Sequence, residues 1–114
     1  MSGISTHILD TATGQPAAGV FVTLSRQNGD ASWQMLSTLA TDGDGRCRQL
    51  LPEDVALVAG DYRIRFETTD YYNAHALKGL YPYVEITFTV REGDTHLHVP
   101  LLLTANGYTT YRGS

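Results

Sequence analysis

Cysteine is nearly absent from this sequence of 114 residues, and so are clusters of positive charge. The single cysteine, Cys47, cannot form an intramolecular disulfide, and no group of cysteines is present to bind zinc. The eight lysine and arginine residues are scattered, and the formal net charge is −4. Because phosphate groups and anionic membrane surfaces are bound by basic patches, we expect neither nucleic acid nor a membrane as a partner.

Long apolar runs are absent as well. No stretch approaches the roughly 20 apolar residues that cross a membrane as a helix. Residues 1–7 lack both the basic and the apolar region of a secretory signal peptide. We therefore expect a cytoplasmic protein, with the periplasm and the peroxisome left open. The length suits a single domain over residues 1–114.

The sequence does contain a repeated alternation of apolar and polar residues, separated by turn-forming residues. Alternation with period two is typical of β-strands that bury one face. We expect strands at residues 4–10, 20–25, 33–39, 62–67, 84–90, 96–103 and 108–111. About seven or eight short strands predict an all-β sandwich of two sheets, with a closed barrel as the main alternative.

One segment departs from the alternation. Asp70 is a suitable helix N-cap, residues 71–77 tolerate a helix, and Gly79 is suited to end one. These features predict a single short helix of about two turns.

The segment 96–103 is the most informative of the expected strands. One of its faces consists of leucine and valine and belongs in the core, whereas the other carries two histidines, a proline and a leucine. The residues of this second face are His96, His98, Pro100 and Leu102. Because Pro100 has no backbone N–H to donate, it suggests a sheet edge or a bulge. An edge strand with an apolar outer face needs a cover, which a second subunit would provide.

Another outward-facing histidine comes from the segment 4–10, where His7 alternates with core-facing residues. If the outer faces of the two segments converge, His7 and His98 line one groove. A single histidine is more often a surface or structural residue than a catalyst, and we assign that ordinary role to His75 and His96. The pair His96 and His98 lacks a third metal ligand, so we expect no metal and no cofactor.

Three stretches of the chain carry a more specific pattern. They are Thr6-His7-Ile8-Leu9-Asp10 through Gly14-Gln15-Pro16-Ala17, Asp44-Gly45-Arg46, and residues 96–103 running on to Tyr111-Arg112-Gly113-Ser114. Together they resemble the transthyretin family, and specifically its hydrolase branch, over nearly the whole chain. The C-terminal tetrapeptide is the most specific part, because the hormone-carrying transthyretins lack it. The resemblance implies a two-sheet, eight-strand sandwich with one short helix, assembled as a homotetramer (a dimer of dimers) with sites in a central channel.

The resemblance also implies an activity and the residues that perform it. The hydrolase branch converts 5-hydroxyisourate to 2-oxo-4-hydroxy-4-carboxy-5-ureidoimidazoline in urate breakdown, with no cofactor. The family's catalytic positions fall on His7, Arg46, His98 and Ser114, and its substrate-binding positions on His7, Arg46, Tyr111, Arg112 and Gly113. Either histidine is expected to move protons, the guanidinium to stabilise negative charge, and the last serine to orient a histidine through its hydroxyl or its terminal carboxylate.

Two other functions are alternatives at this point. The same fold would serve as a transthyretin-like carrier of an aromatic small molecule such as thyroid hormone. Tyr111 and the paired histidines argue against a carrier, because they would narrow and polarise its channel. A structural or adhesive β-sandwich is the second alternative, and the missing secretion signal counts against it.

Overall fold

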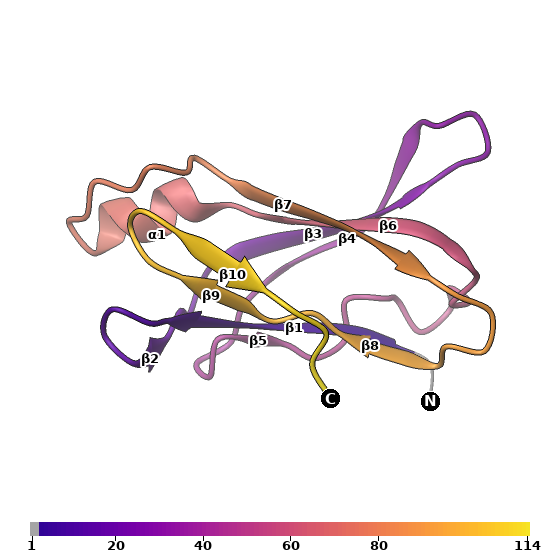
Figure 1. Cartoon of the computed structure of the whole chain (residues 1–114), viewed down its shortest axis with the longest axis horizontal. Coiled ribbons are helices and arrows are strands. Elements are labelled where there is room, and N and C mark those ends of the chain that lie inside the picture. Colours follow the sequence, from indigo (N-terminus) through magenta and orange to yellow (C-terminus); the bar gives the residue numbers. More distant parts are fainter. Residues whose placement is uncertain (1–2) are drawn as a thin grey trace.

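Two β-sheets lie face to face, with one short helix at an end of the sandwich (Figure 1). The computed structural model describes residues 3–114. The elements are β1 (Gly3–Asp10), β2 (Gln15–Pro16), β3 (Phe21–Gln27), β4 (Trp33–Ala40), β5 (Arg46–Cys47), β6 (Gly60–Phe66), α1 (Thr68–Ala74), β7 (Val84–Val90), β8 (His96–His98), β9 (Leu101–Leu103) and β10 (Tyr108–Thr110). The all-β sandwich predicted from the alternation is confirmed, and two separate sheets replace the alternative of a closed barrel.

The first sheet is built around β1, which has partners on both sides. It runs parallel to β8 and β9 on one side and antiparallel to β2 and β5 on the other. β10 then extends this sheet by pairing antiparallel with β9. The second sheet has the order β4-β3-β6-β7 and is antiparallel throughout. The first sheet therefore places the beginning and the end of the chain side by side.

The core lies between the two sheets and contains the residues that the alternation assigned to it. Ile4 and Ile8 of β1, Leu24 of β3, Ile64 of β6 and Leu101 of β9 are each 0% exposed. Burial of one such side chain stabilises the fold by about 1.5–3 kcal/mol. The outer faces of the sheets are therefore free to carry polar groups.

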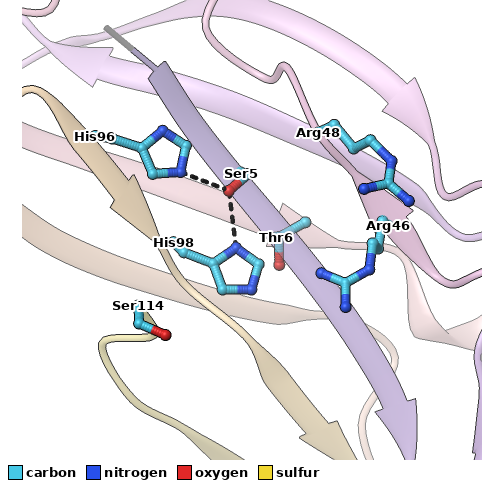
Figure 2. A pocket seen from close by; sticks show the side chains of 7 residues that line it. All are labelled: Ser5, Thr6, Arg46, Arg48, His96, His98 and Ser114. Atoms are coloured by element: carbon cyan, nitrogen blue, oxygen red, sulfur yellow. Dashed lines mark hydrogen bonds between the residues drawn. The ribbon is translucent and has the colours of Figure 1, made fainter. Parts of the chain in front are cut away.

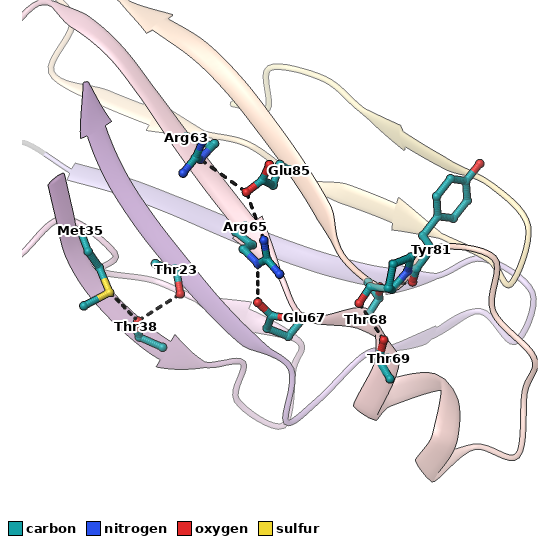
Figure 3. A network of polar contacts seen from close by, with 11 residues as sticks. Thr23, Met35, Thr38, Arg63, Arg65, Glu67, Thr68, Thr69, Tyr81 and Glu85 are labelled. Carbon is teal, nitrogen blue, oxygen red and sulfur yellow. Dashed lines mark hydrogen bonds and ion pairs between the residues drawn. The ribbon is translucent and has the colours of Figure 1, made fainter. Parts of the chain in front are cut away.

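The outer face of the second sheet carries a network of charges (Figure 3). Arg63 and Arg65 of β6 both form ion pairs with Glu85 of β7. The two guanidinium groups also lie over aromatic rings, Arg63 at 4.4 Å from the centre of Trp33 and Arg65 at 3.8 Å from that of Tyr83. Each of the two arginines is thus engaged by both a carboxylate and a ring, as expected for outward positions on β6.

Pro100 divides the expected strand 96–103 into β8 and β9, but it marks neither an edge nor a bulge. Ser5 lies opposite His98 before the interruption and Ile8 lies opposite Leu101 after it, so the register is unchanged. β1 flanks this strand on one side, and β10 and the isolated bridge at Gly113 flank it on the other. The expectation of an edge or a bulge was wrong. A proline requires only a position at which no backbone N–H has to donate to a neighbouring strand, and the interruption between β8 and β9 is such a position.

The helix begins and ends earlier than Asp70 and Gly79 suggested. Residue Glu67 occupies the N-cap without a side-chain cap, and Asp70 lies in the first turn. The hydroxyl groups of Thr68 and Thr69 donate to the carbonyls of Tyr81 and Pro82 (Figure 3). These tertiary hydrogen bonds fix the first turn of α1 and outweigh the local capping preference.

The C-terminus of α1 is closed by a residue that is not glycine. Ala76 has a φ of 54°, and its N–H donates to the carbonyl of Asn73. The N–H of Leu77 donates to the carbonyl of Tyr72, which completes a Schellman motif. Gly79 serves packing instead, since a Cβ there would lie 1.9 Å from the Tyr72 ring.

The single cysteine, Cys47, is buried in the fold. Burial, with a smaller contribution from Asp42, raises the pKa of the Cys47 thiol to about 11, so that thiol stays protonated and unreactive.

Among residues 3–114, no helix is long and apolar enough to cross a membrane. Within the same described range, no three histidine, cysteine or acidic side chains gather as metal ligands do.

Candidate active site

A cavity of about 280 Å³ opens on the first sheet, where β1, β5 and β8 meet the last residue of the chain. Figure 2 shows its side chains converging from these segments. The residues that line it are Ser5, Thr6, Arg46, Arg48, His96, His98 and Ser114. Three of the four expected catalytic residues, Arg46, His98 and Ser114, therefore share one cavity.

The position of Arg46 follows from a tight turn that precedes β5. The Asp42 carboxylate accepts hydrogen bonds from the backbone N–H groups of Asp44 and Arg46, at 2.9 and 3.0 Å. Gly45 has a φ of +74°, and a Cβ on it would lie 2.6 Å from the Ile8 carbonyl oxygen. Only glycine fits this approach, so the turn carries Arg46 onto β1, where it lies opposite His7.

His98 is held by hydrogen bonds on its side chain and on its backbone. Its Nδ1 lies 2.8 Å from the hydroxyl oxygen of Ser5, and the same oxygen lies 3.2 Å from Nε2 of His96. Figure 2 shows the serine hydroxyl between the two imidazole rings. The Ser5 carbonyl also accepts from the N–H of Val99 at 2.9 Å, which fixes β8 against β1.

The electrostatic environment keeps both expected catalytic histidines neutral. Burial lowers the pKa of His98 below its ordinary value of 6.5, and the positive charge of Arg46 lowers it further. Burial and Arg46 lower the pKa of His7 in the same way, against weaker opposing effects of Asp44 and Asp42. A neutral imidazole has a free nitrogen lone pair at pH 7, which a general base requires.

The C-terminal residues dock on β8 rather than fray. The N–H of Gly113 donates to the carbonyl of His98 at 2.8 Å. A Cβ on Gly113 would lie 2.5 Å from Cδ2 of His98 and 3.1 Å from Cγ of Pro100, so the tail backbone lies directly on the imidazole ring. Figure 2 shows Ser114 and Arg46 on opposite sides of His98. The tail thus closes one side of the cavity.

Comparison with known proteins shows to which family this chain is related. The model described as "Transthyretin: HIUase/Transthyretin family" matches residues 4–113. The chain belongs to this family. It is 48% identical to the 5-hydroxyisourate hydrolase of Caulobacter vibrioides, over 100% of both chains. The resemblance stated from the three motifs is confirmed.

Solved structures of the HIUase/Transthyretin family confirm the fold. The 5-hydroxyisourate hydrolase of Klebsiella pneumoniae superimposes with a TM-score of 0.85 at 37% identity, covering 100% of both chains. The transthyretin of Sparus aurata superimposes with a TM-score of 0.90 at 30% identity, covering 99% of this chain and 97% of that chain. The fold is thus common to proteins of both names, and the side chains of the cavity have to distinguish them.

Two of the expected substrate-binding residues point away from the His98 cavity of this HIUase/Transthyretin family member. Tyr111 is 54% exposed. Together with Arg112 it lines a second hollow of about 260 Å³, beside Ile86 and Phe88 of β7. The guanidinium of Arg112 also lies 3.5 Å from the Asp94 carboxylate. His7 is not among the residues that line the cavity. It lies opposite Arg46 in the pair of β1 and β5.

The sequence analysis did not assign to the site four residues that line the cavity of this family member, namely Ser5, Thr6, Arg48 and His96. Ser5 shares a face of β1 with His7 by simple alternation, but it was given no role in the site. His96 was given the ordinary role of a surface or structural histidine. It is exposed, but its ring is bonded to the Ser5 hydroxyl. Both residues surround His98, which the alternation had identified.

Proposed function

We propose that this chain hydrolyses 5-hydroxyisourate to 2-oxo-4-hydroxy-4-carboxy-5-ureidoimidazoline in urate breakdown. The observation that carries the proposal is the convergence of Arg46, His98 and Ser114 on one cavity. The names of the relatives from Caulobacter vibrioides and Klebsiella pneumoniae support the same activity. An oxygen-rich, anionic purine product suits a cavity that holds two arginines, Arg46 and Arg48.

His98 acts as the general base in this proposal. Its neutral imidazole takes a proton from water, and the water oxygen forms a bond to the ring carbon of the scissile carbon–nitrogen bond. Arg46 stabilises the negative charge that develops on the oxygen of the tetrahedral intermediate. The carbon–nitrogen bond then breaks, and the imidazolium returns the proton to the leaving nitrogen. Base catalysis by one positioned imidazole supplies about 10²–10⁴-fold of the rate.

The other expected catalytic residues have supporting roles. His7 lies opposite Arg46 on β5 and shares its electrostatic environment, so we assign it substrate contact and proton transfer on that side of the cavity. Ser114 lies beyond His98 from Arg46 and is assigned the orientation of the substrate or of the imidazole (Figure 2). Gly113 brings this serine into place through its hydrogen bond to the His98 carbonyl.

Tyr111 and Arg112 contribute to binding only if a second subunit completes the site. They line the hollow beside β7, away from His98 of their own chain. We therefore include the homotetramer in the proposal, with these two residues reaching a neighbouring site. Light scattering coupled to size-exclusion chromatography tests the assembly, and a monomer with full activity would refute it. The cytoplasmic location belongs to the proposal as well, and imaging of the tagged full chain tests it.

A stopped-flow absorbance assay tests the activity. Fresh 5-hydroxyisourate is produced by urate oxidase, and its decay is followed with and without the protein. We expect acceleration in the wild type and a loss of about 10²–10⁴-fold in His98→Ala. His75→Ala is the matched control, because it removes an exposed imidazole outside the cavity. Decay at the spontaneous rate would refute the hydrolase, and tight binding of thyroid hormone would then favour the carrier.

A further inference from the structure

The Ser5 hydroxyl lies between two imidazole rings, and this arrangement limits how their protons can be placed. Its oxygen is 2.8 Å from Nδ1 of His98 and 3.2 Å from Nε2 of His96. A serine hydroxyl has one proton to donate, so it can donate to only one of the rings and must accept from the other. The ring that donates to Ser5 is thereby fixed in one tautomer.

The hydrogen bonds through the Ser5 hydroxyl can run in two directions, and only one of these arrangements stays unchanged when His98 gains a proton. If Nδ1–H of His98 donates to Ser5, and Ser5 donates to His96, then Nε2 of His98 is free to take a proton and no bond has to change. In the reverse direction Ser5 donates to Nδ1 of His98, and Nε2 already carries the proton. Protonation would then force the serine hydroxyl to rotate. A base that must cycle between imidazole and imidazolium is served by the first direction.

We propose that Ser5 is a positioning residue that holds His98 in its Nδ1-protonated tautomer, with the exposed His96 accepting the serine proton. The chain of donors runs from His98 to Ser5 to His96. It directs the free Nε2 lone pair of His98 into the cavity. Its catalytic consequence depends on the function proposed above, whereas the tautomer itself does not.

The backbone makes the serine a rigid support. Ser5 and His98 are directly opposite each other in the parallel pair of β1 and β8. The Ser5 carbonyl accepts from Val99, and the Thr6 hydroxyl next to it donates to the Val99 carbonyl at 2.6 Å. The Ser5 residue is 7% exposed, so water has little access to replace its hydroxyl. The distance between the hydroxyl and the ring is therefore set by the sheet.

Several charged or titratable groups face His98 and affect its titration along with Ser5. They are His96 on its own strand, His7 on β1, Arg46 on β5, and Arg48 and Ser114 around the cavity. Three of these, Arg46, His7 and His96, lower the pKa of His98. An oxygen that accepts from Nδ1–H favours the imidazolium instead. Removing the Ser5 hydroxyl should therefore lower the pKa of His98 further.

The decisive measurement is the tautomer of His98 in the wild-type protein, from two-bond ¹⁵N–¹H correlation NMR above the pKa of the ring. We expect Nδ1 protonated in the wild type and a mixture of tautomers in Ser5→Ala. A wild-type ring protonated on Nε2 would overturn the inference, whatever the kinetics. This spectrum needs no substrate, so it tests the inference even if hydrolysis of 5-hydroxyisourate is not found.

Kinetics test the catalytic consequence in the full chain. Ser5→Ala should lower kcat by about 10- to 100-fold through loss of orientation. KM should change little, and the acid limb of the pH profile should move to lower pH. Ser5→Thr keeps a hydroxyl and should restore most of the rate. Ser25→Ala is the matched control, because Ser25 is also 7% exposed but lies on β3 of the other sheet.

Two results would refute the positioning role in an active wild type. One is Ser5→Ala with an unchanged kcat and pH profile. The other is a loss of kcat that Ser5→Thr fails to restore while the acid limb stays in place, which indicates a merely structural serine. An inactive wild type with the expected tautomer would refute the proposed function and leave the hydrogen-bond chain established.

Discussion

Replacing Gly113 by alanine separates the activity of this protein from its stability. The added Cβ would lie 2.5 Å from Cδ2 of His98, whereas ordinary contacts begin near 3.4 Å. Either the imidazole or the tail must move by about 1 Å, a displacement that costs about 10²-fold in rate when it affects a catalytic group. We therefore expect Gly113→Ala to lower kcat/KM for 5-hydroxyisourate by roughly 100-fold.

The same substitution should change the free energy of unfolding very little. If the tail undocks, the hydrogen bond from Gly113 to the His98 carbonyl is lost, which costs about 1 kcal/mol. An undocked tail is as free in the folded protein as in the unfolded chain, so the exchange of glycine for alanine adds no further change. The net destabilisation should therefore be no more than about 1 kcal/mol.

Stopped-flow decay of 5-hydroxyisourate and urea denaturation measure the two effects on the same preparations. Gly107→Ala is the matched control in the loop before β10, since a Cβ there would meet its nearest neighbour, the Thr104 hydroxyl, at an ordinary 3.7 Å. It should leave the rate unaffected. Full activity in Gly113→Ala would refute the argument that contact between the tail and the imidazole matters. A loss of several kcal/mol would show that the tail belongs to the structural core.

Three more predictions follow from the described contacts. The pKa of His98 is lowered below 6.5, so the rate of hydrolysis should stay constant near pH 7 and decline only as the pH falls through that pKa. Arg46→Gln removes a positive charge and should raise the pKa of His98 in an NMR titration. An unchanged or lower pKa in this variant would contradict the assigned cause. Tyr71→Phe removes the donor to the buried Asp10 carboxylate and should destabilise the fold by about 1.5–3 kcal/mol in urea, and a smaller loss would mean that the carboxylate finds another donor. Ala76→Gly should stabilise by about 0.5–1 kcal/mol, because Ala76 has a φ of 54°, and no gain in Tm would show that the helix end relaxes.

The sheets could be predicted from the sequence because burial on one face of a strand is a local property. Tyr62, Ile64 and Phe66 alternate with polar residues, and all three are fully buried in β6. The pairing of strands is not local in this way. The interruption at Pro100 looked like an edge or a bulge because its neighbour β1 comes from a distant part of the chain.

The helix shows how tertiary contacts override a local signal. Asp70 is a good N-cap by residue type, yet α1 begins at Thr68. The hydrogen bonds from Thr68 and Thr69 to the segment before β7 decide the start, and no pattern within residues 68–77 reveals them. Gly79 was interpreted as a helix end because its role beside the Tyr72 ring depends on a contact that is visible only in the folded chain.

The candidate site was predictable as far as strand faces determine it. His98 stood out because an outward position was occupied by a histidine, and Arg46 and Ser114 came from the family motifs. The role of Ser5 depends on its register with His98, which alternation does not supply. The direct contributions of Tyr111 and Arg112 stay predictions, because these side chains lie at the hollow beside β7.

The parallel pairing of β1 with β8 and β9 also determines when this protein can be completed during synthesis. β1 leaves the ribosome well before its parallel partners β8 and β9. Closing so long a loop is entropically costly, and non-local parallel pairing is slow. Until β8 and β9 have paired with it, one edge of β1 has no neighbouring strand. The cavity beside His98 therefore forms only after β8 has been synthesised and has paired with β1.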